Sequence, residues 1–211
     1  MFLNLQLLFV SVVLVFFVQC WADSNIKITV YYEPLGEDSV KFITNQLYPA
    51  YKQIGDHLNV DLIPKVNKTA FGRKLGKSQY TYPYETKESY LAAIHACVLN
   101  MYSPEQRTEF VSCSANTNEP SSNDNLKKCA KQADLNWEDI TKCTKSAQPD
   151  KLLNSYYRQS VMENISKYPT ILINDEYDRM LEQKALFNFK AVMCQLMDDL
   201  PEGCRVEERD L

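Results

Sequence analysis

The first candidate for a reactive or ligand-binding site in this chain is a run of four residues, Gly36-Glu37-Asp38-Ser39. An alternating apolar stretch runs into them and a helical pattern runs out of them, so they lie at a junction between a strand and a helix. In α/β proteins, ligands and reactions are found at such junctions, at the carboxyl ends of strands. This junction carries two carboxylates and a hydroxyl but no thiol or imidazole.

These residue types permit three interpretations. Asp and Ser are good N-caps, and Glu suits the first turn of a helix, where the dipole is positive; each such interaction contributes about 0.3–1 kcal/mol. We therefore expect Glu37, Asp38 and Ser39 mainly to cap the helix. The alternative is a contact site for a partner or a cation at Glu37 and Asp38, although two carboxylates are too few for a calcium loop. A hydrolase built on Ser39 lacks a neighbouring base and an orienting group.

The other residues with catalytic potential are scattered. His57 and His95 stand apart from any Ser-Asp constellation, and we expect each to be a surface or packed histidine. No two cysteines have the C-x-x-C spacing of a zinc knuckle or a redox pair, so we expect no metal and no cofactor. The net charge of −4, without a basic cluster, argues against binding to nucleic acid.

The beginning of the chain predicts a signal peptide. Residues Phe2 to Val18 are almost wholly apolar, and Cys20-Trp21-Ala22 places small residues where a signal peptidase requires them, so we predict cleavage after Ala22. No other stretch is long and apolar enough to span a bilayer, so no membrane span is expected after cleavage.

The remaining cysteines fit a secreted chain. An even number in such a chain predicts three disulfides. The six residues are Cys97, Cys113, Cys129, Cys143, Cys194 and Cys204. We favour a Cys194–Cys204 disulfide, which would join the C-terminal tail to the last helix. The pairing of the other four cysteines stays open. The sequons at Asn67 and Asn164 predict N-glycosylation.

The elements that position the junction follow from changes in apolar period. Residues 26–32 alternate as a strand, residues 39–58 have helical spacing that Pro49 should kink or divide, and residues 59–66 return to a strand. This order favours a parallel strand pair with a right-handed crossover. Residues 67–86 predict a long loop. Its tyrosines form either a binding surface or core packing; those singled out are Tyr80, Tyr82 and Tyr84.

The second half of the chain is helical and then returns to strand. Most of residues 90–162 has helical spacing, and this region holds four of the six cysteines. Within it, Ser103-Pro104 predicts a helix start, with an N-cap followed by proline at the first helical position. Residues 169–173 form a β-branched run, residues 174–176 a turn, Tyr177 begins a short return strand, and a final helix follows.

The order of elements predicts the fold class. A β-α-β unit, a disulfide-rich helical insertion and a β-β-α unit together make an α/β protein with a thioredoxin-like core. We expect a signal peptide at 1–22, the N-terminal half of the core at 23–70, the loop and insertion at 71–165, and the C-terminal half at 166–211. In that fold a cis-proline begins the third strand and faces the first helix, and Pro169 is in position for it.

The chain resembles the gamma-interferon-inducible lysosomal thiol reductase (GILT) family, specifically its insect GILT-like members, mosquito ones included. The resemblance extends over nearly all of the chain after the signal peptide. It rests on Val30-Tyr31-Tyr32-Glu33-Pro34-Leu35, Leu47-Tyr48-Pro49, Ala96-Cys97-Val98-Leu99, the spaced Cys113, Cys129 and Cys143, Tyr168-Pro169-Thr170, and Met193-Cys194-Gln195-Leu196 followed by Cys204. The resemblance implies disulfide reduction by a C-x-x-C motif that directly follows Tyr-Tyr-Glu-x-Leu.

The chain departs from that family at the motif itself. Gly36 and Ser39 stand where the resemblance places the two cysteines. The family signature that begins Cys-Gln-His-Gly is also altered. It appears here as Ser78-Gln79-Tyr80-Thr81, followed by Ser89, Ala92 and Cys97.

Two functions are compatible with this sequence. We expect no thiol reductase activity and a secreted binding or regulatory protein with a protein or cell-surface partner. The alternative is an oxidoreductase with a relocated cysteine pair. We expect extracellular residence, with the lysosome or endosome as the alternative.

Overall fold

The structure of the protein, a computed structural model, describes residues 25–66 and 86–205 of the 211-residue chain. The predicted signal peptide, the sequon at Asn67 and the tyrosines Tyr80, Tyr82 and Tyr84 lie outside the described residues.

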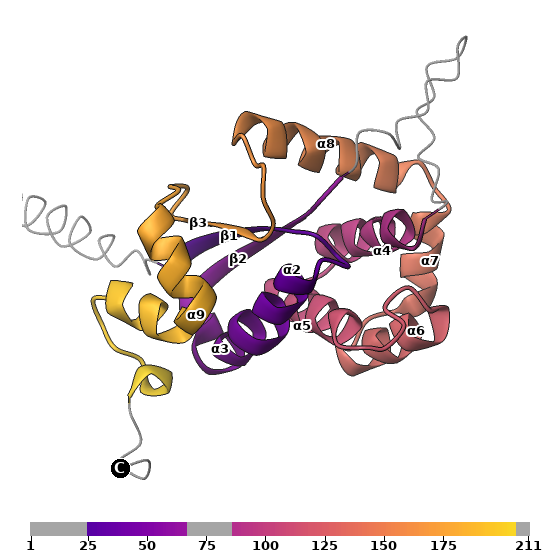
Figure 1. The fold of residues 1–211 in the computed structure, drawn as a ribbon. Helices are drawn as coiled ribbons and strands as arrows, with labels where there is room; N and C mark the ends of the chain where they lie inside the picture. The colour runs from indigo at the N-terminus through magenta and orange to yellow at the C-terminus, as the bar shows by residue number, and fades with distance from the viewer. Residues whose placement is uncertain (1–24, 67–85, 206–211) are drawn as a thin grey trace, which may run out of the picture.

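A small mixed sheet forms the centre of the fold (Figure 1). Its strands are β1 (Ile26–Tyr32), β2 (Leu58–Pro64) and β3 (Thr170–Ile173), in the order β2-β1-β3. The β1–β2 pair is parallel, as the β-α-β pattern predicts, and the β1–β3 pair is antiparallel. The carboxyl ends of β1 and β2 therefore meet at one edge of the sheet, where the candidate junction begins.

Alternation along β1 divides the core into two sides. Ile28 and Val30 are fully buried in the main apolar cluster together with helices on one face of the sheet. Tyr31 points to the other face, where it packs with Ile63 and Leu172 beside Tyr156 of α8. Both faces of the sheet are thus covered, which explains why even the polar Thr29 is buried.

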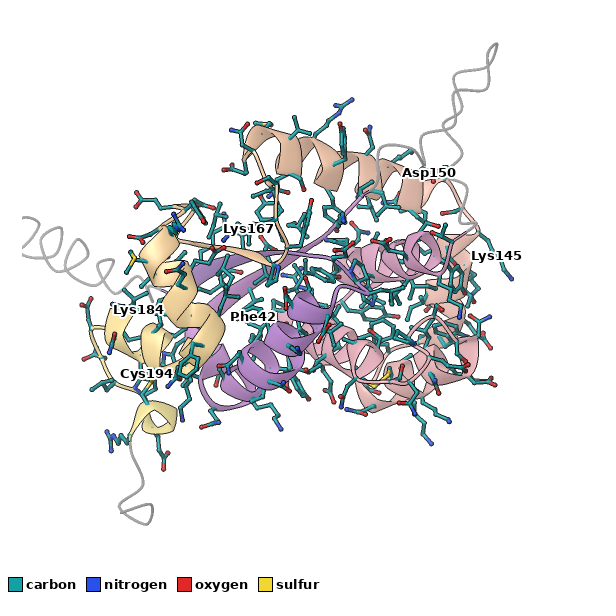
Figure 2. The ribbon with its side chains drawn as sticks, viewed as in Figure 1. Phe42, Lys145, Asp150, Lys167, Lys184 and Cys194 are labelled. Atoms are coloured by element: carbon teal, nitrogen blue, oxygen red, sulfur yellow. A yellow bond between two sulfur atoms is a disulfide. The ribbon has the colours of Figure 1, made fainter. Side chains whose placement is uncertain are left out.

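The helix after the junction is continuous, but its hydrogen-bonding pattern changes before Pro49. It consists of α2 (Glu37–Phe42), a π-helical segment η1 (Ile43–Leu47) and α3 (Tyr48–Ile54), followed by a 3-10 turn η2 (Gly55–His57). Pro49 has no N–H to donate into the preceding turn, and the widened segment lies directly before it. Phe42 points inward and meets Phe189 edge-on at 5.6 Å between ring centroids (Figure 2).

The insertion between β2 and β3 is helical. It contains α4 (Lys87–Met101), α5 (Pro104–Ala115), α6 (Asn123–Gln132), α7 (Trp137–Thr144) and α8 (Gln148–Met162). Ser103 and Gln106 form a capping box that starts α5 directly before Pro104, as the sequence predicts. Two disulfides hold the insertion together: Cys97–Cys143 joins α4 to α7, and Cys113–Cys129 joins α5 to α6.

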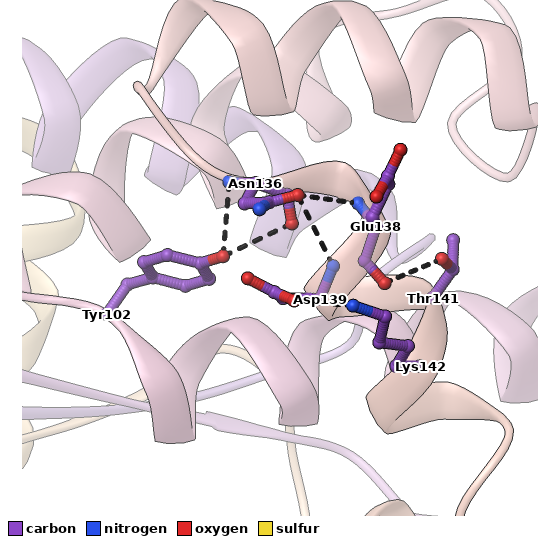
Figure 3. A network of polar contacts seen from close by, with 6 residues as sticks. All are labelled: Tyr102, Asn136, Glu138, Asp139, Thr141 and Lys142. Carbon is purple, nitrogen blue, oxygen red and sulfur yellow. Dashed lines mark hydrogen bonds and ion pairs between the residues drawn. The ribbon is translucent and has the colours of Figure 1, made fainter.

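A polar network fixes the start of α7 against the end of α4 (Figure 3). The side chain of Asn136 accepts hydrogen bonds from the backbone N–H groups of Glu138 and Asp139 at 2.9 and 3.4 Å. The hydroxyl of Tyr102 donates to the carbonyl of Asn136 and accepts from its N–H, both at 3.2 Å. These contacts satisfy the free donors at the start of the helix, and the Cys97–Cys143 bond joins the same two helices.

The predicted strand at Tyr177 is wrong in extent. Past β3, the structure has only an isolated bridge between Ile173 and Glu176. The side chain of Asp178 accepts hydrogen bonds from the N–H groups of Met180 and Leu181, so α9 (Arg179–Leu196) begins before a strand can extend. The helix bends at Asn188.

The tail is held against the last helix. A short 3-10 turn, η4 (Glu202–Cys204), is joined to α9 by the Cys194–Cys204 disulfide, which is the pair favoured from the sequence.

Candidate functional site at the β1–α2 junction

A tight turn connects β1 to α2. The N–H of Gly36 donates to the carbonyl of Glu33 at 3.0 Å, and Gly36 itself is the N-cap of α2. The neighbouring strand arrives at the same place, because the N–H of Lys65, just after β2, donates to the carbonyl of Tyr32 at 2.7 Å. The turn therefore sits at the edge where both parallel strands end.

Ser39 is a structural anchor of this turn. Its side chain is 1% exposed, and its Oγ accepts a hydrogen bond from the backbone N–H of Glu33 at 3.0 Å. No histidine contacts it, because both ring nitrogens of His95 bond elsewhere. Ser39 consequently has neither the exposure nor the base that a nucleophile requires.

The space beside Gly36 is occupied by Glu33. A Cβ built on Gly36 would lie 2.9 Å from the Cβ of Glu33 and 3.0 Å from its Oε2. The other carboxylate oxygen of Glu33 accepts from Lys65 Nζ at 2.6 Å, and this ammonium lies 5.2 Å from the ring centre of Tyr168. The hydrogen bond to Glu33 raises the pKa of Lys65. The arrangement is an ion pair packed over the turn.

The predicted capping by side chains is wrong. The N-cap of α2 is Gly36, which makes no side-chain cap, while Ser39 lies inside the helix and bonds backwards to Glu33. Glu37 and Asp38 are exposed in the first turn, where the helix dipole still favours their charge. Glu37 pairs with Lys41 at 2.6 Å, and this hydrogen bond lowers the pKa of Glu37.

The segment before β3 contains the expected proline. The peptide bond between Tyr168 and Pro169 is cis. The fully buried carboxylate of Glu182, on the first turn of α9, holds this segment in place. It bonds the Lys167 ammonium and accepts from the backbone N–H of Ile171 and the hydroxyl of Tyr177, each at 3.1 Å (Figure 2 shows Lys167).

His95 is buried, and its ring bonds two residues that the sequence analysis did not connect with it. Its Nδ1 lies 2.8 Å from the hydroxyl of Tyr32, and its Nε2 lies 2.9 Å from Oγ of Ser114. Burial lowers the pKa of His95 to about 3, so the ring is neutral. Residues 91–99 of α4 are apolar on all sides apart from His95, which is the signal that the ring is buried. Its partners lie on β1 and α5, and only the packed fold brings them to the ring.

The other residues singled out from the sequence lie in several parts of the fold. Asn164 is exposed and follows α8 with a φ of 53°, and Asn67 lies outside the described residues. His57 lies in η2, partly exposed and away from the junction. Each cysteine in the described ranges belongs to a disulfide.

The described residues contain neither a cluster of metal ligands nor a helix that could span a membrane. Within residues 25–66 and 86–205, no group of three His, Cys, Asp or Glu side chains is arranged to hold a metal ion. In the same ranges, no helix combines the length and the apolar character needed to cross a membrane.

The sequence matches a known protein family. The family model described as Gamma interferon inducible lysosomal thiol reductase (GILT) matches residues 27–133. GILT-like protein 1 of Drosophila melanogaster is 29% identical over 191 residues, covering 83% of this chain and 76% of that protein. The Gamma-interferon-inducible lysosomal thiol reductase-like protein of Anopheles gambiae is 26% identical over 214 residues, covering 94% and 88%.

Solved structures share the fold. MdbA, a thiol-disulfide oxidoreductase from Actinomyces oris, matches with a TM-score of 0.57 at 12% identity, covering 84% of this chain and 83% of that chain. Reduced DsbA from Mycobacterium tuberculosis matches with a TM-score of 0.54 at 15% identity, covering 85% and 86%. The fold is thus a thioredoxin-like α/β fold of the DsbA type.

Proposed function

Because the chain belongs to the gamma interferon inducible lysosomal thiol reductase family, we propose that it is a thiol-reductase-like protein that acts as a non-catalytic binding or regulatory protein. The observation that supports this proposal is the β1–α2 junction, which holds Gly36 and a buried, hydrogen-bonded Ser39 and no thiol. The resemblance to the family implies that its two reactive cysteines would stand at these two positions.

Thiol–disulfide exchange requires a thiolate that attacks and a second thiol that resolves the mixed disulfide. Gly36 offers no side chain, and Ser39 offers a buried hydroxyl that is engaged with the backbone. A helix N-terminus normally stabilises the reactive thiolate. At α2, the exposed carboxylates of Glu37 and Asp38 are the negative groups in that first turn.

A disulfide-reduction assay with insulin as substrate and a low-molecular-weight reductant tests the proposal. The full-length secreted chain should add no turnover to the rate of the reductant alone. The double variant Gly36→Cys/Ser39→Cys should gain measurable turnover, and the matched variant Gly36→Ser, which adds a side chain of similar size without a thiol, should not. Turnover by the unmodified chain that disappears when a cysteine is replaced would overturn the proposal.

A relocated redox pair is the second candidate, and one observation favours it. Cys194 and Cys204 are both partly exposed, whereas Cys97 and Cys129 are buried. An accessible disulfide can be opened by a mild reductant. Counting thiols on the native chain before and after such treatment distinguishes the candidates, because a non-catalytic chain should expose none.

We also propose that the chain is secreted after cleavage behind Ala22 and resides outside the cell, with the lysosome or endosome as the alternative. Three disulfides support folding in the oxidising secretory pathway. The expected partner is a protein or a cell-surface component. Mass spectrometry of the medium and of purified lysosomes would identify the mature N-terminus, the compartment and any glycan on Asn67 or Asn164.

A further inference from the structure

A groove of about 590 Å³ opens between α3 and α5, which lie side by side in Figure 1. Asn25, directly before β1, and Leu58, the first residue of β2, contribute to its lining. The groove therefore lies at the amino ends of the parallel strands. The β1–α2 junction follows their carboxyl ends, roughly 20 Å away along a seven-residue strand. The side chains that define its chemistry are Tyr48, Tyr51, Lys52, Asp56, Glu105 and Glu109.

Two tyrosine rings supply the aromatic part of the groove. The ring of Tyr51 lies against Gly55, so closely that a Cβ at Gly55 would be 2.9 Å from its Cε1. Glycine is therefore what allows this ring to occupy the groove. The ring of Tyr48 already attracts a cation of the chain itself, because Lys52 Nζ lies 5.3 Å from its centre.

The groove has an excess of negative charge. Asp56, Glu105 and Glu109 contribute three carboxylates, and Lys52 is the one cation among the described residues that line the groove. Among the residues that the structure describes, none of these three carboxylates forms an ion pair. Glu109 accepts a hydrogen bond from Gln132 at 3.1 Å, and a hydrogen bond with Glu109 is among the causes that raise the pKa of Tyr48.

This negative charge helps to raise the pKa of the two phenol groups, Tyr48 and Tyr51. After burial, the nearby carboxylate of Glu109 is the largest cause that raises the pKa of Tyr48. For Tyr51 the corresponding cause is Glu105, and Arg107 opposes it. A cation placed in the groove would therefore enter a negative potential bordered by aromatic rings.

We propose that this groove binds a basic segment of a partner protein through an arginine side chain. The guanidinium group would pack against the rings of Tyr48 and Tyr51 and pair with the carboxylates of Glu105 and Glu109. Arginine suits this lining because its planar group stacks on aromatic rings and bonds carboxylates in a bidentate manner. An acidic segment would be repelled, and an apolar one would remove the carboxylates from water without compensation.

The groove is large enough for an arginine side chain, and its proposed binding does not depend on the residues of the β1–α2 junction. Its volume falls within the range of about 300–1,000 Å³ typical of ligand pockets. The groove gives the proposed binding function a partner class, yet it would bind such a segment whether or not the cysteines have redox activity. Reductase activity of the unmodified chain would contradict the proposed non-catalytic function but not the groove. Absence of peptide binding would contradict the groove but not the loss of catalysis.

Titration of the full-length chain with short peptides, followed by NMR, tests the groove. The probe is the capped peptide Ac-Gly-Arg-Gly-Arg-Gly-NH2, and its control carries glutamine in place of each arginine. The arginine peptide should shift the resonances of Tyr48 and Tyr51 in a saturable manner, and added salt should weaken the binding. Equal binding of the glutamine peptide, or shifts confined to other surfaces, would overturn the proposal.

Matched variants separate the groove from the overall charge. Glu105→Gln/Glu109→Gln should weaken binding of the arginine peptide about fivefold, because two partly exposed ion pairs are lost. Glu138→Gln/Glu176→Gln removes the same charge from exposed sites outside the groove and should leave binding unchanged. If both double variants weaken binding equally, the attraction is non-specific and the groove is not the site.

Discussion

At the scale of single residues, the junction is held by contacts that a thiol would disturb. The hydroxyl of Ser39 accepts the N–H of Glu33, and the missing side chain of Gly36 leaves room for Glu33 to reach Lys65. A sulfur atom is a larger and weaker acceptor than a hydroxyl oxygen. Installing cysteines at both positions therefore requires Glu33 to move, so the expected gain of reductase activity in that double variant is partial.

Ser39→Ala tests the anchoring role of this hydroxyl. The substitution leaves the N–H of Glu33 without its partner, and the free energy of unfolding should fall by about 1–2 kcal/mol. Urea unfolding followed by circular dichroism measures the change. Asp38→Ala, at an exposed neighbouring position, should change stability by less than about 0.5 kcal/mol. Equal effects of the two variants would contradict an anchoring role for Ser39.

At the scale of elements, the first turn of α9 holds the segment that contains the cis-proline. Glu182 is fully buried and joins Lys167, Ile171 and Tyr177, so a single carboxylate connects the segment, β3 and the turn before the helix. The contact also closes the outer edge of β3, because the N–H of Ile171 bonds Glu182 and that of Ile173 bonds Glu176. A partner is therefore not expected to add a strand at this edge.

Glu182→Ala should detach the segment from α9. The N–H of Ile171 loses a charged acceptor within the core, so we expect the free energy of unfolding to fall by about 3 kcal/mol. Hydrogen exchange at the Ile171 amide should accelerate more than exchange within α4. Glu176→Ala removes an exposed carboxylate nearby and serves as the control. Unchanged exchange at Ile171 in the Glu182 variant would show that the carboxylate does not hold the strand.

At the scale of the whole molecule, no disulfide joins the insertion to the sheet in the described part of the chain. Cys97–Cys143 and Cys113–Cys129 lie within the insertion, and Cys194–Cys204 lies within the C-terminal half. Apolar packing joins the two parts, and polar contacts add to it. His95 connects α4 to β1 and α5, and Arg107 of α5 bonds Val60 and Asp61 of β2.

The contacts of His95 also fix where its proton lies. The hydroxyl of Ser114 donates to the carbonyl of Val111 at 2.9 Å, so its oxygen accepts from Nε2–H of His95. Nδ1 is then the acceptor for the hydroxyl of Tyr32. A second proton on the ring would displace this hydrogen bond in a fully buried place, which is why the folded chain keeps the ring neutral.

Stability should consequently fall in acid. The pKa of His95 is about 3 in the folded chain, below the ordinary value of 6.5, so the unfolded chain binds a proton first as pH falls. The stabilisation is complete above about pH 6.5 and is lost between there and about pH 3. From pH 7 to pH 5 we expect a loss of about 2 kcal/mol from this group.

Urea unfolding at a series of pH values measures this loss. His95→Gln should lower stability at pH 7 but flatten its dependence on pH between 7 and 5. His57→Gln, at a partly exposed position, should leave the slope unchanged. A slope that persists in the His95 variant would assign the acid sensitivity to other groups.

The sequence by itself determined the features that depend on near neighbours. The alternation of residues 26–32 predicted β1 with its two faces, and the Ser103-Pro104 pair marked the start of α5. The order of elements was also predicted, except for the return strand at Tyr177. These features follow from local backbone preferences and from which side of each element is apolar, and both are encoded within a few residues. The cis bond before Pro169 was expected from the place of this proline in the fold class.

Only the tertiary structure decided which distant residues meet. Four cysteines allow several pairings, and packing of α4 on α7 and of α5 on α6 selected one. The sequence suggested that Ser39 caps α2, but in the structure its hydroxyl accepts a hydrogen bond from the N–H of Glu33. This contact depends on how the turn after β1 folds over α2. The Glu33–Lys65 pair and the groove between α3 and α5 likewise join segments far apart in the chain, and their geometry exists only after the core has packed.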